Sequence, residues 1–418
     1  MALVRERERF LRYVFSVQYN GTPFLGFSYQ GPQGENCITK TGVDLRGLFS
    51  IEGKIRRALD SLVNGRNKTN MSCRDDTIIC CDDDDDKLLE SNFENFQVSS
   101  RTDRGVHAWK NTFHVDIRSN HPSKQSWETH KLLKGLNYYL KRDYQYLQEY
   151  SASESTKFKL HGINNNKKMN KSSIQHPPIL TGNEIRILSC KAAPLELIEN
   201  KHYDPDLILD HSNDEKFDNT MCQPSHISWN ARFTALRRTY VYRILSHSIL
   251  EPNNTDIDLM EEFGVPFEDN WSWRVLHHDL ELNIPEMTRA VEVLKGTHDF
   301  SSFRGKNCSR SSPIVTIENL SIDIHPLHPN MIGFYKHSQN SAIDITNAKI
   351  ITIMIQGDAF LYRQVRNIVG CLIEVGKNQL SSEDVRGILL ARDRSKAGVM
   401  APAHGLFLAN VEHHNLLI

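Results

Sequence analysis

The sequence lacks the features that mark membrane, secreted and nucleotide-cofactor proteins. No run of about 18 apolar residues occurs, so the 418-residue sequence predicts no membrane span. Its eight cysteines are scattered and none form a C-x-x-C pair, so we expect reduced thiols in an intracellular protein. No phosphate-cradling glycine loop and no dinucleotide fingerprint is present, so no nucleotide cofactor is expected. The adjacent His413 and His414 lack metal-ligand spacing, and we expect no metal site.

Net charge is also nearly absent, at -1 for the whole chain. The stretch 66–95 contains four basic and nine acidic residues, so the rest of the chain has a positive balance. A neutral total is therefore compatible with a basic cleft. Five consecutive aspartates, 82–86, repel one another and predict a surface insertion over about 66–92. The alternative for this insertion is a metal-binding or RNA-mimicking acidic tract.

The first residues form a charged arm, 1–11, that mixes arginine with glutamate. Transit peptides avoid acidic residues, so a mitochondrial leader is disfavoured, although an organelle signal stays the alternative. The sequence leaves mitochondrion, cytoplasm and nucleus open.

Strands alternate with helices in both halves of the chain, which predicts an α+β fold. We expect an N-terminal α/β subdomain over 12–205, with insertions at about 66–92 and 148–182 as loops, and a C-terminal α/β subdomain over 225–418. The predicted strands are 13–19, 96–100, 112–117, 185–190, 238–245, 316–324, 350–356 and 405–411. The predicted helices are 43–62, 131–142, 287–294, 360–375 and 382–391.

One loop, residues 100–108 with sequence SRTDRGVHA, concentrates chemistry between two strands. Asp103 lies between Arg101 and Arg104, and nearby guanidinium groups are expected to lower the pKa of a carboxyl. An ionised aspartate in a cleft can act as a nucleophile, and Gly105 permits tight backbone geometry. The alternative is a turn in which Asp103 caps backbone amides and Arg101 makes a surface ion pair.

Six segments in order resemble the TruA family of tRNA pseudouridine synthases. The loop 100–108 resembles the family signature G-R-T-D-A-G-V-H-A. The other segments are Y-N-G-T at 19–22, W-N-A-R-F-T-A at 229–235 followed by R-T-Y-V-Y at 238–242, G-T-H-D-F-S-S-F-R at 296–304, F-L-Y-R-Q-V-R-N-I-V-G at 360–370, and A-P-A-H-G-L-F-L at 401–408. Both halves are covered, and the last two segments are most similar to the eukaryotic pseudouridylate synthase-like branch.

The resemblance implies isomerisation of uridine to pseudouridine in transfer RNA or another structured RNA. The base must leave its stack and enter a pocket. By resemblance, Asp103 attacks the nucleotide, Arg366 pairs with Asp103, and Tyr240 stacks on the uracil and helps to move a proton. Tyr242 shares the strand face of Tyr240 and could take its place. The alternatives are a snorkelling helix arginine for Arg366 and a core aromatic for Tyr240.

Further residues are expected to contact substrate. Arg101 resembles an arginine that occupies the space left by the flipped base, and Leu406 would wall the pocket. The remaining expected contacts are Thr102, Arg104, Gly105, His107, Asn230, Arg232, Phe233, Phe303, Arg304 and Lys306. Lys110, Arg304, Lys306 and Arg310 would neutralise phosphates, whereas solvated surface charge is the alternative for each. For His107, a hydrogen-bonded structural role is favoured over a catalytic one.

Three departures from the family pattern concern substrate fit. Ser100 replaces glycine, Arg104 replaces alanine and Asn230 replaces histidine. The resemblance also implies two ferredoxin-like (RNP-like) subdomains around a central cleft, a homodimer, and no cofactor because the rearrangement involves no redox change. Two other functions stay open: a catalytically silent RNA-binding or chaperone protein, and an aspartate-nucleophile phosphatase, which would need a second acid for magnesium.

Overall fold

One continuous β-sheet organises the chain in the computed structural model. The structure describes residues 10–28, 50–64, 92–119, 126–154, 182–193, 229–248, 268, 270–277, 281–327 and 348–414. In the described residues the sheet has ten strands in the order β4-β1-β3-β10-β5-β9-β8-β7, with β2 beside β3 and β6 beside β5. The pairings are antiparallel except β10 with β3 and β5 with β6. The fold is therefore mixed α/β with a large, mostly antiparallel sheet.

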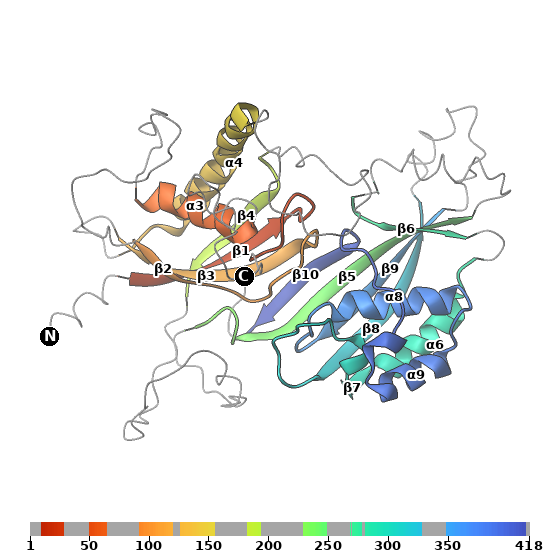
Figure 1. Cartoon of the computed structure of the whole chain (residues 1–418). Helices are drawn as coiled ribbons and strands as arrows, with labels where there is room; N and C mark the ends of the chain where they lie inside the picture. Colours follow the sequence, from red (N-terminus) through yellow and green to blue (C-terminus); the bar gives the residue numbers. More distant parts are fainter. Residues whose placement is uncertain are drawn as a thin grey trace, which may run out of the picture.

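The elements of the N-terminal part are β1 (Phe10–Tyr19), α3 (Ile51–Val63), β2 (Phe93–Val98), β3 (His107–Arg118), α4 (Thr129–Glu154) and β4 (Ile185–Ala192). The elements of the C-terminal part are β5 (Ala235–Ser248), β6 (Trp273–His277), α6 (Ile284–Leu294), β7 (Gly296–Asp299), β8 (Ile314–Pro326), β9 (Lys349–Gly357), α8 (Gln364–Gly376), α9 (Ser382–Ala391) and β10 (Leu406–His413). Helices α3 and α4 lie over the first group of strands, and α6, α8 and α9 lie over the second (Figure 1). Among the described residues, no helix is long and apolar enough to cross a membrane.

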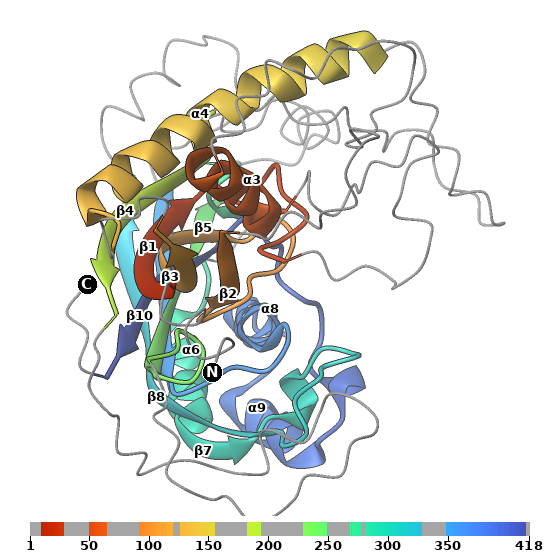
Figure 2. The same cartoon turned by 90° about the vertical axis from the view of Figure 1, so that its left-hand side faces the viewer.

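The final strand joins the two parts of the sheet. β10 lies between β3 and β5, as the blue strand between orange and green in Figure 1. It pairs parallel with β3 at His107 and Ala108, and antiparallel with β5, where Leu408 lies opposite Tyr240. The view in Figure 2 shows the same neighbourhood of β1, β3, β10 and β5 from the side. Strand β10 therefore connects the strands of the N-terminal part to those of the C-terminal part.

Most of the predicted helices and strands are confirmed. In the helices α9 and α3, the apolar spacing in the sequence is accompanied by a capping residue at the start. Helix α9 begins after Ser381, whose hydroxyl accepts from the backbone of Asp384 while the Asp384 carboxylate accepts from Ser381 in return. This capping box satisfies donors that the first helical turn leaves without partners. In the same way, Ser50 caps α3 by accepting from Gly53 at 3.0 Å.

Three expectations need correction. Helix α4 continues to Glu154, so residues 148–154 are helical and do not belong to a loop. The segment 143–154 contains no glycine or proline, so nothing in it ends the helix. Helix α8 begins at Gln364 and not at 360, because Arg363 has a left-handed backbone. The predicted arm ends before residue 10, where β1 begins.

The remaining predictions for loops lie outside the described residues. These are the acidic insertion, the second insertion beyond residue 154, and the start of the first helix at 43–49. The division into subdomains 12–205 and 225–418 stays a prediction.

Helix α8 approaches the segment before β10 very closely at Gly370. A β-carbon there would lie 1.8 Å from the carbonyl oxygen of Val399. Gly370→Ala should therefore lower the free energy of unfolding by about 1–3 kcal/mol through overpacking. Thermal unfolding monitored by circular dichroism measures the change.

The matched control is Gly387→Ala in α9, where a β-carbon would meet no atom within 4 Å. This substitution should stabilise the protein by about 0.5–1 kcal/mol, because alanine loses less backbone entropy in a helix. Equal effects of the two substitutions would contradict the predicted steric contact.

Candidate active site

Asp103 lies in the loop between β2 and β3, where Thr102 before it and Gly105 after it have well-defined conformations. The carbonyl of Thr102 accepts the backbone N–H of Phe27 at 3.0 Å. The hydroxyl groups of Thr102 and Tyr19 are 2.9 Å apart and hydrogen-bonded. Gly105 has φ 78°, a left-handed conformation that glycine adopts at little cost. The Thr102 side chain, which was expected to contact substrate, is therefore hydrogen-bonded to the end of β1, and its contact with substrate stays a prediction.

Arg366 of α8 reaches the carboxylate of Asp103 from 263 residues away in sequence. Its Nη1 lies 3.4 Å from Oδ2 of Asp103, and its Nε donates to the carbonyl of Ala401 at 2.8 Å. The side chains of Arg366 and Asp103 are 10% and 21% exposed. The Asp103 carboxylate is thus partly buried against a guanidinium that is itself held by the chain before β10.

Tyr240 of β5 completes this group. Its hydroxyl lies 2.9 Å from the hydroxyl of Ser100, at the start of the Asp103 loop. Its ring meets the Phe360 ring edge-on, with centroids 5.1 Å apart. Tyr242, two residues on, is fully buried and donates to the carbonyl of Pro402 at 2.8 Å. Tyr240 is therefore the tyrosine bonded to the Asp103 loop, whereas Tyr242 is anchored in the core.

The backbone that presents Ser100 is fixed on two sides. Asn111 donates its amide to the carbonyl of Ser100 at 2.8 Å. Arg238 donates to the carbonyl of Ser99 at 3.1 Å. The Ser100 hydroxyl is therefore presented to Tyr240 by an ordered segment.

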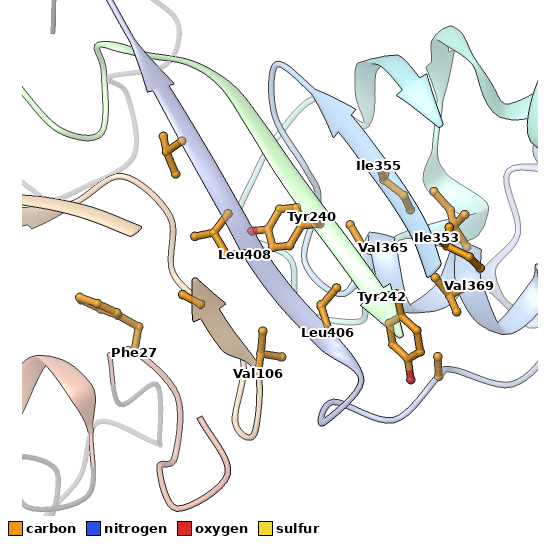
Figure 3. Close-up of a cluster of buried hydrophobic side chains, with 14 of the residues drawn as sticks. Phe27, Val106, Tyr240, Tyr242, Ile353, Ile355, Val365, Val369, Leu406 and Leu408 are labelled. Carbon is orange, nitrogen blue, oxygen red and sulfur yellow. The ribbon is translucent and has the colours of Figure 1, made fainter. Parts of the chain in front are cut away.

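Figure 3 shows Tyr240 and Tyr242 on β5 beside Leu406 and Leu408 of β10, with Val365 of α8 nearby. Leu406 is buried and lies opposite Tyr242 in the strand register. The apolar surface next to Tyr240 is therefore built from β10 and α8 together.

Burial and the arginine charges oppose each other at Asp103. Burial is the larger effect and raises the pKa of the Asp103 carboxyl, while the charges of Arg366 and then Arg363 lower it. The expectation that flanking Arg101 and Arg104 lower this pKa is wrong, since both side chains are exposed and the active cations come from the start of α8. Burial also raises the pKa of Tyr240, whose phenol stays neutral.

Three residues that were expected to contact substrate lie in one turn just before β5. The Asn230 side chain accepts from the backbone of Arg232 at 2.9 Å and from that of Phe233 at 3.3 Å. Phe233 is 63% exposed, and the Arg232 guanidinium lies 5.6 Å from its ring centroid. Partial desolvation and then the charge of Arg101 lower the pKa of Arg232. Asn230 therefore shapes the turn that presents Arg232 and Phe233, near Arg101.

Three residues that were expected to contact substrate make contacts within the protein. Phe303 is 0% exposed and lies in the core, and its contact with substrate stays a prediction. His107 is fully buried, its Nδ1 accepts from Gly21 at 3.2 Å, and burial lowers its pKa to about 4. This agrees with the structural role favoured for His107. Arg304 donates to the carbonyls of Cys308 and Arg310, so it closes its own loop. In contrast, Lys306 is exposed.

The sequence did not single out Arg363, the carbonyl of Ala401 or the Ser100 hydroxyl as parts of this site. Arg363 lies one helical turn before Arg366, and this spacing was the available signal. Ser100 was noticed only as a departure from a glycine. In the part of the chain that the structure describes, no group of three His, Cys, Asp or Glu could hold a metal ion.

The comparisons with known proteins find tRNA pseudouridine synthases. The family model described as tRNA pseudouridine synthase matches residues 290–414, a range that includes Arg366 and Leu406. Over this range the chain is similar to the TruA family of tRNA pseudouridine synthases. One TruA relative, tRNA pseudouridine synthase A of Orientia tsutsugamushi, is 24% identical over 96% of this chain and 100% of its own length.

Higher identity extends over a shorter part of other TruA proteins. tRNA pseudouridine synthase A of Ehrlichia chaffeensis is 36% identical over 44% of this chain, and that of a Thermoanaerobacter species is 34% identical over 44%. These alignments span 60% and 59% of the relatives' own lengths. The similarity to the eukaryotic branch stays a prediction.

The balance of forces at Asp103 predicts the effect of removing its partner. Arg366→Gln should raise the pKa of Asp103 further, because burial remains and the largest opposing charge is lost. Carbon-13 NMR titration of the aspartate carboxyl groups measures this shift. Arg386→Gln, on the exposed surface of α9, is the control and should leave Asp103 unchanged. A constant or lower pKa in Arg366→Gln would show that the ion pair does not stabilise the Asp103 carboxylate.

Proposed function

We propose that the chain is an RNA pseudouridine synthase that isomerises uridine with Asp103 as its nucleophile. The observation that carries the proposal is the 3.4 Å pair of Asp103 and Arg366, assembled beside Tyr240 from three separate segments. The names of the relatives support transfer RNA as the substrate. By family resemblance we also propose two ferredoxin-like subdomains around the site, and a homodimer.

The reaction breaks the bond from the ribose to the ring nitrogen of uracil and makes a bond to a ring carbon. A partly desolvated carboxylate is a stronger nucleophile than a hydrated one, and Arg366 keeps it ionised. Asp103 attacks the ribose carbon of the glycosidic bond, and uracil leaves with the bonding electrons on its ring nitrogen. The base turns, its ring carbon attacks the same ribose carbon, and the Asp103 carboxylate is released. The proton on that ring carbon then moves to the ring nitrogen. The base has to leave its stack for this chemistry, so we expect a base-sized pocket beside Asp103.

Tyr240 is placed to contact the flipped base. An aromatic ring stacked on a base contributes about 1–3 kcal/mol. Its neutral hydroxyl is bonded to Ser100 and is a group through which a proton can move. Leu406 supplies apolar surface on the same side of the sheet, and Arg101 would fill the space that the base leaves.

The two rival functions have less support. A silent RNA-binding protein has no need for a carboxylate buried against an arginine, which costs desolvation energy. A magnesium-dependent phosphatase needs a second carboxylate near Asp103. In the described part of the chain, the charged side chains that act on Asp103 are Arg366 and Arg363, and neither is a carboxylate. Loss of activity on addition of EDTA would favour the phosphatase.

Asp103→Asn should abolish pseudouridine formation, with a loss of roughly three orders of magnitude or more, because a covalent nucleophile is removed. Carbodiimide labelling followed by primer extension on a transfer RNA transcript measures the product. Asp323→Asn, an exposed position on β8, is the matched control and should retain full activity. Equal product from wild type and Asp103→Asn would reject catalysis by Asp103.

Ser100→Ala should slow the single-turnover rate roughly three- to tenfold, the equivalent of about 0.5–1.5 kcal/mol for one hydrogen bond. The reason is that the Tyr240 hydroxyl loses its partner at 2.9 Å. The same substitution made in a Tyr240→Phe background tests the pathway, since the interaction is then already absent. If Ser100→Ala slows both backgrounds equally, Ser100 does not act through Tyr240.

A further inference from the structure

Arg363 has a backbone conformation that its side chain makes costly. It precedes the first residue of α8 with φ 62° and ψ 9°, in the left-handed region that favours glycine. It lies three residues before Arg366, so the two side chains project from neighbouring positions at the start of the helix. Strained backbones of this kind concentrate at functional sites, where the surrounding structure holds them in place.

The neighbours of Arg363 fix its position. Gly305 donates its backbone N–H to the carbonyl of Tyr362 at 2.7 Å. A β-carbon at Gly305 would lie 3.2 Å from the β-carbon of Arg363, so the loop that leads to the exposed Lys306 passes directly against Arg363. The guanidinium of Arg363 lies 4.7 Å from the centroid of the Tyr362 ring. A planar guanidinium on an aromatic face keeps its N–H edge available to a ligand.

The charged side chains at the start of α8 and at Asp103 have a net positive charge. Asp103 is paired with Arg366, which balances one negative charge with one positive charge. Arg363 adds a second positive charge, and it is exposed. Among the described residues, its guanidinium makes no hydrogen bond or ion pair. Arg304 differs, because its guanidinium is used by the carbonyls of its own loop.

We propose that Arg363 binds a phosphodiester group of the RNA next to the nucleotide that enters the Asp103 site. The inference rests on the proposed function, because it takes RNA as the ligand. A guanidinium fork matches two phosphate oxygens, and such charge-assisted pairs are geometrically specific. Lys306, on the adjoining loop, would add a second cation to the same stretch of backbone. Arg363 is then a substrate-binding residue that sets the position of the ribose relative to Asp103.

The test uses the full chain and an unmodified transfer RNA transcript as the probe. Arg363→Asn removes the charge and keeps a residue that tolerates the left-handed backbone. The matched control is Arg392→Asn, because Arg392 is also left-handed at φ 51° and also exposed, and it pairs with Asp299 on the surface. Arg363→Lys retains the charge and loses the planar fork. Dissociation constants are measured at several salt concentrations.

Arg363→Asn should raise the dissociation constant roughly five- to tenfold at about 0.1 M salt, and make the slope of log affinity against log salt shallower by about 0.7–0.9. Arg363→Lys should retain the slope and lose part of the affinity. Arg392→Asn should match wild type. An unchanged slope in Arg363→Asn, or an equal change in Arg392→Asn, would overturn the phosphate contact.

Two further readouts separate the possible failures. If Arg363→Asn shifts the acid limb of the pH–rate profile and leaves RNA binding unchanged, Arg363 acts on Asp103 and the phosphate proposal is rejected. Wild-type protein that converts uridine while Arg363→Asn binds RNA normally rejects only this inference. Wild-type protein that forms no pseudouridine in the same transcript counts against the proposed function itself.

Discussion

The partly buried ion pair of Asp103 and Arg366 is the interaction that constrains the rest of the architecture. Removing two charges from water costs free energy, which their attraction offsets only with good geometry and further hydrogen bonds. Arg366 obtains such a bond from the carbonyl of Ala401 at 2.8 Å. That carbonyl belongs to the segment that leads into β10, so the same contact ties the catalytic candidate to the strand between the two halves. Gly370 serves this arrangement, because only a residue without a β-carbon lets α8 approach the neighbouring backbone at Val399 so closely.

The opposing effects at Asp103 suit a carboxylate that must react and not merely bind. Full solvation would leave it ionised but well hydrated, and burial without a cation would leave it protonated. Here burial is the larger effect on its pKa, and two arginines at the start of α8 act against it. Burial likewise raises the pKa of Tyr240, and there the hydrogen bond to Ser100 and then the charge of Arg238 act against it. Burial thus favours the neutral phenol of Tyr240 and opposes the ionised carboxylate of Asp103, which the arginines support.

Local sequence patterns predicted most helices and strands. The features that these patterns did not predict depend on contacts between residues far apart in the sequence. Helix α9 was predictable because Ser381 and Asp384 form a capping box in sequence. The start of α8 was not, because an arginine at 363 carries no local signal for positive φ and is held there by tertiary contacts. Asp103, Tyr240 and Arg366 were identified by resemblance, and their approach depends on β10, whose parallel pairing with β3 no local pattern indicates. The cations that act on Asp103 were misassigned to Arg101 and Arg104, since adjacency in a loop does not set side-chain direction.

The net charge of -1 for the whole chain does not describe the surroundings of Asp103, where two arginines act on the carboxyl group. Exposed charges separated by more than about 10 Å are largely screened at ordinary salt, so a polyanion responds to the local surface and not to the total. The arginines that act on Asp103 are Arg366 and Arg363. At another place, partial desolvation and then the charge of Arg101 lower the pKa of Arg232. Such repulsion costs stability in the free protein and is relieved when an anion binds between the cations. Neighbouring cations of this kind favour an anionic ligand, in line with the RNA substrate that we propose.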